Sequence, residues 1–186
     1  MSPAGKRRLL EAIEAGKGFI GFHAASDTFH SRGPRNQTQP VEQRDPFIRM
    51  LGGEFVTHGR QQEAAVIITS RFPGVRDWGM AESISFYEEW YALKNFAPDL
   101  HVILVQDTER MVGDMYQRPK YPCTWARLHG KGRVFYTSLG HREDIWTNPH
   151  VKSMVLGALA WAAGNVDVNV EPNIDRVAPK ANQLSR

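Results

Sequence analysis

The chain has 186 residues, of which 41% are apolar and 23% are charged, a composition typical of one soluble globular domain and unlike that of a disordered chain. No apolar run approaches the ~18 residues that a membrane-spanning helix needs, and no signal peptide is recognisable, so we expect a cytoplasmic protein without membrane contact. The net charge of +3, without a patterned basic patch, does not predict nucleic-acid binding. The single cysteine, Cys123, excludes an internal disulfide and a cysteine-based zinc cluster.

The chain begins with signals for a helix, a strand and a long loop. Apolar residues at helical spacing predict a helix over residues 4–15, and the glycines that follow predict its end. A short apolar run predicts a strand over residues 19–22, directly before His23. Residues 26–44 are polar and contain glycine and proline, which predicts a long exposed loop.

The middle of the chain predicts a short helix followed by strands. Asp45 as N-cap and Pro46 at the first helical position predict a helix that ends before Gly52. Further extended segments are predicted over residues 64–69, 83–93, 101–106, 123–128 and 133–138, the last two forming a hairpin. An apolar face at helical spacing predicts a helix over residues 149–163.

Two regions follow from these elements. Residues 1–164 are predicted to form one α/β domain, and residues 165–186 a C-terminal arm. In the arm, Val166, Val168 and Val170 alternate with polar residues, which predicts either a docked segment or an extra edge strand before a loose end.

Reactive side chains follow several of the apolar runs. His23 follows the first strand, and His141 follows the second strand of the hairpin. Because the carboxyl ends of parallel strands meet at one edge of a sheet, we expect these two histidines to lie close together. The alternation of side chains along a strand places Glu89 on the same face as Tyr91, so we favour Glu89 over Glu88 as the inward carboxylate.

Three histidines and one carboxylate would suit a divalent ion, with zinc as the first candidate. The predicted ligands are His23, His58, Glu89 and His141. Such an ion would lower the pKa of a bound water toward ~7 and let it react near neutrality. Spacing alone leaves the plainer interpretation open, in which each histidine is hydrogen-bonded in the interior or lies on the surface.

Several motifs occur in an order that resembles the ThuA-like (trehalose utilisation) family, over roughly residues 16–164. The motifs are Gly18-Phe-Ile-Gly-Phe-His-Ala-Ala, Gly52-Gly-Glu-Phe-Val-Thr-His58, Glu88-Glu-Trp-Tyr91, Gly130-Lys-Gly-Arg-Val-Phe-Tyr-Thr-Ser-Leu-Gly-His141, Trp146 and Ala160-Trp-Ala-Ala-Gly164. The resemblance implies a flavodoxin-like fold akin to class I glutamine amidotransferases, with helices on both faces of the sheet.

The chain also departs in two ways from the proteins that it resembles. Amidotransferases carry a nucleophilic cysteine on the turn where this chain has His23, and Cys123 lies elsewhere, so glutaminase activity is not expected. Relatives begin with a strand, a helix and a further strand, on the order of 50 residues in two βα units, that this chain lacks. We therefore expect a sheet without its N-terminal strands, whose edge is exposed or covered by another subunit in a homo-oligomer.

The leading hypothesis is a metal-assisted hydrolase or lyase that acts on a disaccharide or a keto-sugar derivative. His23, Glu89 and His141 are the predicted catalytic residues, and Asp27 is expected to orient His23. The predicted substrate-binding residues are Asp27, Tyr91, Trp125, Arg127 and Trp146.

Two alternatives remain open from the sequence. One is a carbohydrate-binding or accessory module of the same fold without catalysis. The other is a metal-free hydrolase in which His23 or His141 acts as general base, paired with Glu89 or Asp27.

Overall fold

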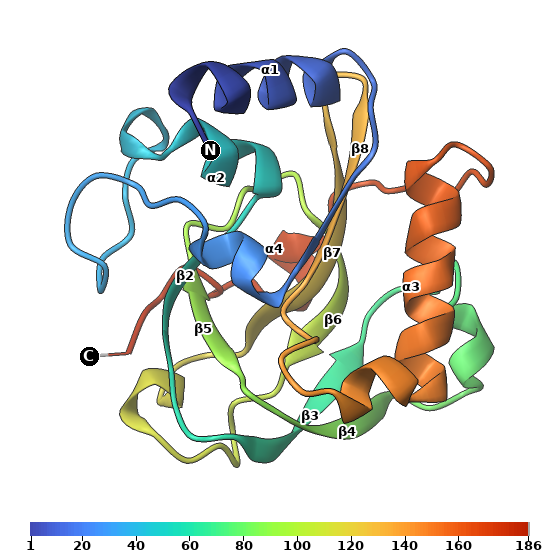
Figure 1. Cartoon of the computed structure of the whole chain (residues 1–186). Helices are drawn as coiled ribbons and strands as arrows, with labels where there is room; N and C mark the ends of the chain where they lie inside the picture. The colour runs from blue at the N-terminus through green and yellow to red at the C-terminus, as the bar shows by residue number, and fades with distance from the viewer. Residues whose placement is uncertain (186) are drawn as a thin grey trace.

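The computed structural model describes residues 1–185 and shows a curled six-stranded sheet with helices on both faces (Figure 1). The strand order is β1-β8-β7-β6-β3-β4, with β1 Phe19–Phe22, β3 Gln62–Ile68, β4 Ser83–Glu88, β6 His101–Gln106, β7 Tyr121–His129 and β8 Gly132–Thr137. Strand β1 pairs with β8 in parallel, and the remaining neighbours are antiparallel. The predicted α/β class is confirmed, and the sheet is mixed.

Different elements cover the two faces of the sheet. Helices α1 (Pro3–Glu14) and α2 (Pro46–Leu51) lie on one side of β8, and α3 (Pro149–Ala162) lies on the other (Figure 1). Along β8, Val134 and Tyr136 pack into the core beneath α1 and α2, whereas Phe135 packs into the core beneath α3. This alternation follows from the opposite directions of successive side chains in a strand. No helix within residues 1–185 combines the length and apolar character needed to cross a membrane.

The predicted caps form at α2. The Asp45 carboxylate accepts a hydrogen bond of 2.8 Å from the Phe47 amide, and Pro46 occupies the first turn. Gly52 ends the helix with a φ of 92°, a left-handed conformation that glycine adopts without steric cost. The chain then enters β2 (Glu54–His58), which pairs antiparallel with β5 (Tyr91–Lys94) in a separate two-stranded sheet.

The single extended segment predicted over residues 83–93 is wrong, because the chain changes sheets there. Strand β4 pairs with β3, whereas β5 pairs with β2, and Glu89 and Trp90 form the link. Trp90 is fully buried and donates its indole N–H to the Gln62 carbonyl at 2.9 Å. Burial of this large side chain fixes the crossing and leaves Glu89 off both strands.

The loop over residues 26–44 is mostly exposed, as predicted, while polar groups hold its buried residue Gln39 against β5. The Lys94 ammonium donates to Gln39 Oε1 at 2.8 Å and to the Gln37 carbonyl at 3.0 Å. The backbone N–H of Gln39 donates to Asn95 Oδ1 at 2.8 Å. Burial lowers the pKa of Lys94, while the nearby Glu54 carboxylate opposes this shift.

The C-terminal arm docks on the domain without forming a strand within residues 165–185. The Asn173 side chain bonds both the N–H and the C=O of Val102, at 2.7 and 3.0 Å. The Asn182 side chain contacts Phe96 in the same way, at 2.9 and 3.2 Å. Helix α4 (Ile174–Val177) buries Ile174 between these two anchors. The arm is therefore held as far as Asn182 rather than loose, and Arg186 lies outside the described residues.

Candidate active site

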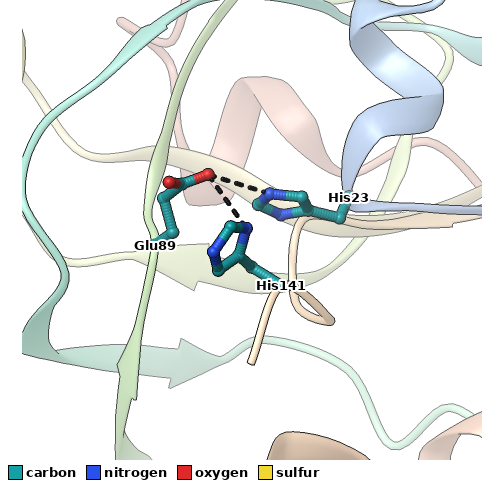
Figure 2. Close-up of side chains that lie close together, drawn as sticks. All are labelled: His23, Glu89 and His141. Carbon is teal, nitrogen blue, oxygen red and sulfur yellow. Dashed lines mark hydrogen bonds and ion pairs between the residues drawn. The ribbon is translucent and has the colours of Figure 1, made fainter. Parts of the chain in front are cut away.

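Three of the predicted site residues meet beyond the ends of β1 and β8 (Figure 2). His23 follows β1 and His141 lies beyond β8, and the parallel pairing of these strands brings the two histidines together. Glu89 reaches them from the link between β4 and β5. Its Oε2 atom lies 3.2 Å from His23 Nε2 and 3.2 Å from His141 Nδ1. One ligand atom from each residue falls within 4.8 Å of the others, which is close enough to share one ion.

The conformation of His23 determines what its ring presents to the site. The residue has a φ of 38°, a left-handed conformation uncommon outside glycine, and it is 8% exposed. Its Nδ1 lies 2.7 Å from the Ser138 carbonyl oxygen, which only accepts hydrogen bonds, so Nδ1 carries a proton. A neutral His23 then points the lone pair of Nε2 at the Glu89 carboxylate. Two facing acceptors require a proton on either group or a cation that both of them bind.

His58 lies on the other side of Glu89. Its Nδ1 is 3.4 Å from Glu89 Oε1 and also donates to the Gly59 carbonyl at 3.0 Å. Its side chain is 46% exposed, and it is not part of the three-residue set that could share one ion. The structure thus brings together His23, Glu89 and His141 as predicted and places His58 beside them.

Glu88 is part of the site, although the sequence indicated no role for it. It is fully buried, and its carboxylate accepts backbone hydrogen bonds from Glu89 at 2.8 Å, Gly140 at 2.9 Å and Arg142 at 3.2 Å. The only local signal was the pair of adjacent glutamates. Glu88 contacts the loop around His141, which lies far along the chain, and no local sequence pattern signals such a contact.

Tyr91 lines the site through its ring, which packs against His23 with ring centroids 3.9 Å apart. Its hydroxyl makes no hydrogen bond to another residue in the described part of the chain. Burial raises the pKa of Tyr91 to about 12, and the neighbouring Glu89 and Asp27 carboxylates add to this shift. The hydroxyl stays protonated at neutral pH, and the residue as a whole is 5% exposed.

A polar pocket of about 610 Å³ opens next to His141. It is lined by Gln61, His141, Arg142, Glu143, Asp144 and Thr147. Arg142 binds both oxygens of Asp144, at 2.9 and 3.1 Å, and donates to Gln61 Oε1 at 2.9 Å. The pocket is shallow and open, and it presents donors and acceptors next to His141, while His23 and Glu89 do not line it.

Two of the predicted substrate contacts belong to the interior instead. Trp125 is fully buried and donates its indole N–H to the Leu51 carbonyl at 2.8 Å. Arg127 is 7% exposed, donates to the Met50 carbonyl at 3.0 Å and pairs with Asp99 at 2.7 Å. Both side chains support the end of α2, and Arg127 lines a separate pocket with Arg49, Asp99 and His129. Neither side chain lines the pocket beside His141, where the sequence places a sugar. Aromatic and arginine side chains in a sequence do not distinguish a core from a binding face.

The other predicted substrate-binding residues, Asp27 and Trp146, lie near the site. Asp27 pairs with His30 at 3.2 Å and Arg35 at 3.5 Å, whereas the His23 ring bonds Ser138 and Glu89. The expectation that Asp27 orients His23 is therefore wrong. Trp146 is 42% exposed and donates its indole N–H to the Gly140 carbonyl at 3.1 Å, next to His141.

The lone cysteine lies away from the His23 turn. Cys123 is fully buried in β7, and its Sγ contacts the Leu104 carbonyl oxygen at 3.5 Å. Burial raises the pKa of the thiol to about 12, so the thiolate needed for nucleophilic attack is not formed at neutral pH.

Comparisons with solved structures show which proteins share this fold. A ThuA-like protein from Bacteroides uniformis superposes with a TM-score of 0.64 at 20% identity, over 87% of this chain and 64% of that one. A ThuA-like protein from Parabacteroides merdae gives a TM-score of 0.57 at 20% identity, over 97% and 71% of the two chains. A β-galactosidase from Bacillus circulans sp. alkalophilus gives a TM-score of 0.56 at 11% identity, over 92% of this chain and 22% of that enzyme, and shares only the fold.

No curated protein matches the sequence. The chain spans 64% of the length of the Bacteroides protein. The sequence model of the ThuA family, described as trehalose utilisation, matches residues 1–162. The chain therefore belongs to the ThuA family.

Proposed function

We propose that this protein is a metal-dependent enzyme that processes a disaccharide or a keto-sugar derivative. Membership of the ThuA family supports a carbohydrate-related role. The observation that carries the proposal is the orientation of His23. Its protonated Nδ1 is fixed by Ser138, so its Nε2 faces Glu89 Oε2 at a distance of 3.2 Å.

The donor set fits a divalent cation. Two imidazole nitrogens and one carboxylate oxygen are typical zinc ligands, and three protein ligands leave a position open for substrate or water. In such sites a backbone carbonyl commonly accepts a hydrogen bond from the ring nitrogen of the histidine that does not bind the metal. The Ser138 carbonyl does this for His23. When bound, the ion would polarise a sugar oxygen or activate a water.

The surroundings of these residues suit a sugar. The pocket beside His141 offers the guanidinium of Arg142, the carboxylates of Glu143 and Asp144 and the amide of Gln61 for hydroxyl groups. The Tyr91 hydroxyl is a further donor, and the exposed ring of Trp146 offers an apolar face. We assign Tyr91 and Trp146 to substrate binding on these grounds.

The test compares metal-free and zinc-loaded protein on a panel of disaccharides and their keto derivatives. We expect product only from the zinc-loaded protein, and none from Glu89→Gln. His150→Ala, which removes a histidine from α3, serves as the matched control and should remain active. Equal turnover by metal-free protein would favour a general base at His23 instead. Binding without product across the panel would favour a carbohydrate-binding module.

A further inference from the structure

We infer that Glu88 is a positioning residue that holds all three proposed ligands in one arrangement. This inference rests on the proposed metal site and goes beyond it, because Glu88 itself touches neither the ion nor the pocket. It acts through the backbone on two segments that are far apart in the sequence.

The contacts of Glu88 connect these two segments. One carboxylate oxygen accepts the Glu89 amide at 2.8 Å and the Arg142 amide at 3.2 Å, and the other accepts the Gly140 amide at 2.9 Å. The side chain is fully buried, so water does not compete for these bonds. Both neighbours of His141, and the amide of Glu89, are therefore held by one carboxylate.

The loop over residues 138–142, which Glu88 holds, also contacts His23. The Ser138 carbonyl at its start accepts the Nδ1 proton of His23 at 2.7 Å. Gly140 in its middle has a φ of 122°, and a Cβ there would lie 2.9 Å from the Trp146 ring, so a side chain at this position would strain the loop and displace it. Moving this loop would displace His141 and the hydrogen bond that orients His23 together.

Glu54 provides a natural comparison. It is also a buried glutamate, 1% exposed, and its carboxylate accepts the Ser31 amide at 2.9 Å and the Asn95 side chain at 2.7 Å. It supports the loop that packs on β5 and makes no hydrogen bond to His23, Glu89 or His141. A glutamine at either position keeps the size of the side chain but replaces one acceptor oxygen with a donor NH₂. The two substitutions change the side chain in the same way, and only the one at position 88 is expected to affect the site. Glu54→Gln also removes the negative charge 3.9 Å from the Lys94 ammonium, so its cost should appear in stability rather than in metal affinity.

The first measurement is titration with Co²⁺, whose visible absorption reports the ligand set. We expect Glu88→Gln to weaken Co²⁺ binding by about 10- to 100-fold, as loss of a partner that orients a metal ligand usually does. Glu54→Gln should bind Co²⁺ as the unchanged protein does. In a His141→Ala background the additional loss caused by Glu88→Gln should be smaller but not zero, because the part that acts through His141 is already gone while the contact with the Glu89 amide remains. Unchanged affinity in Glu88→Gln, or fully additive losses, would overturn the inference.

The second measurement does not depend on a metal. In hydrogen exchange, Glu88→Gln should speed exchange of the Gly140 and Arg142 amides, whereas Glu54→Gln should leave them unchanged. If the unchanged protein binds no Co²⁺ or Zn²⁺, the proposed function fails while this measurement still tests the contact. Unaltered exchange at both amides would contradict the role of Glu88.

A second variant covers the case in which Glu88→Gln does not fold. Gly140→Ala leaves Glu88 in place but pushes the loop away from Trp146. We expect it to weaken Co²⁺ binding in the same direction. Full affinity in a folded Gly140→Ala protein would show that the position of the loop does not matter.

Discussion

The ring of Tyr91 packs against the ring of His23, with centroids 3.9 Å apart, and its hydroxyl has no hydrogen-bond partner in the part of the chain that the structure describes. Tyr91→Phe should therefore cost little stability but weaken sugar binding by about three- to tenfold, the value of one hydrogen bond. Calorimetric titration with the best disaccharide of the panel measures this loss. Tyr121→Phe is the comparison, since its hydroxyl already donates to the Tyr91 carbonyl at 3.1 Å. It should lower stability and leave sugar affinity unchanged, and the reverse pattern would refute the role of Tyr91.

The left-handed backbone of His23 predicts an order of stability among its variants. Asparagine tolerates this conformation, whereas a β-branched side chain is strained in it. We expect His23→Val to be less stable than His23→Asn by about 1–3 kcal/mol. Urea unfolding measures the difference, and both variants should lose the metal. Equal stability would mean that the turn after β1 relaxes without cost.

Stability should fall in alkaline solution. Burial raises the pKa of Cys123 from 9.0 to about 12 and that of Tyr91 from 10.0 to about 12, and it raises the pKa of Tyr136 as well. The folded protein keeps these groups neutral, while the unfolded chain ionises them at their ordinary pKa values. Their contribution is therefore complete below about pH 9 and is lost as the pH rises toward 12.

Urea unfolding at several pH values checks this dependence. The free energy of unfolding should decrease from about pH 9 upward, and Cys123→Ala should remove the part of the decrease that starts first. A constant free energy of unfolding across this range would contradict the burial of these groups.

Local signals in the sequence predicted much of the fold. Asp45, Pro46 and Gly52 specify the two ends of α2 through contacts within a few residues, and the structure shows each of them in its expected position. The meeting of His23 and His141 was also predictable, because it depends only on two parallel strands ending at the same edge.

The features that the sequence did not predict depend on distant contacts. Burial of Trp90 makes the chain change sheets between β4 and β5, and no alternation of side chains signals this crossing. The bonds that Glu88 accepts from Gly140 and Arg142 likewise join segments that lie 52 and 54 residues apart in the chain. The chemistry of Trp125 suits both a sugar-binding face and a core, and only its full burial in the structure distinguishes the two roles.

The central claim is that His23, Glu89 and His141 together bind one divalent ion. Calorimetric titration of the metal-free protein with Zn²⁺ tests it most directly, alongside His23→Ala, Glu89→Gln, His141→Ala and the control His150→Ala. We predict one ion per chain in the unchanged protein and the control, with strongly reduced affinity in each of the three site variants. Absence of stoichiometric binding, or equal affinity in Glu89→Gln, would contradict the claim.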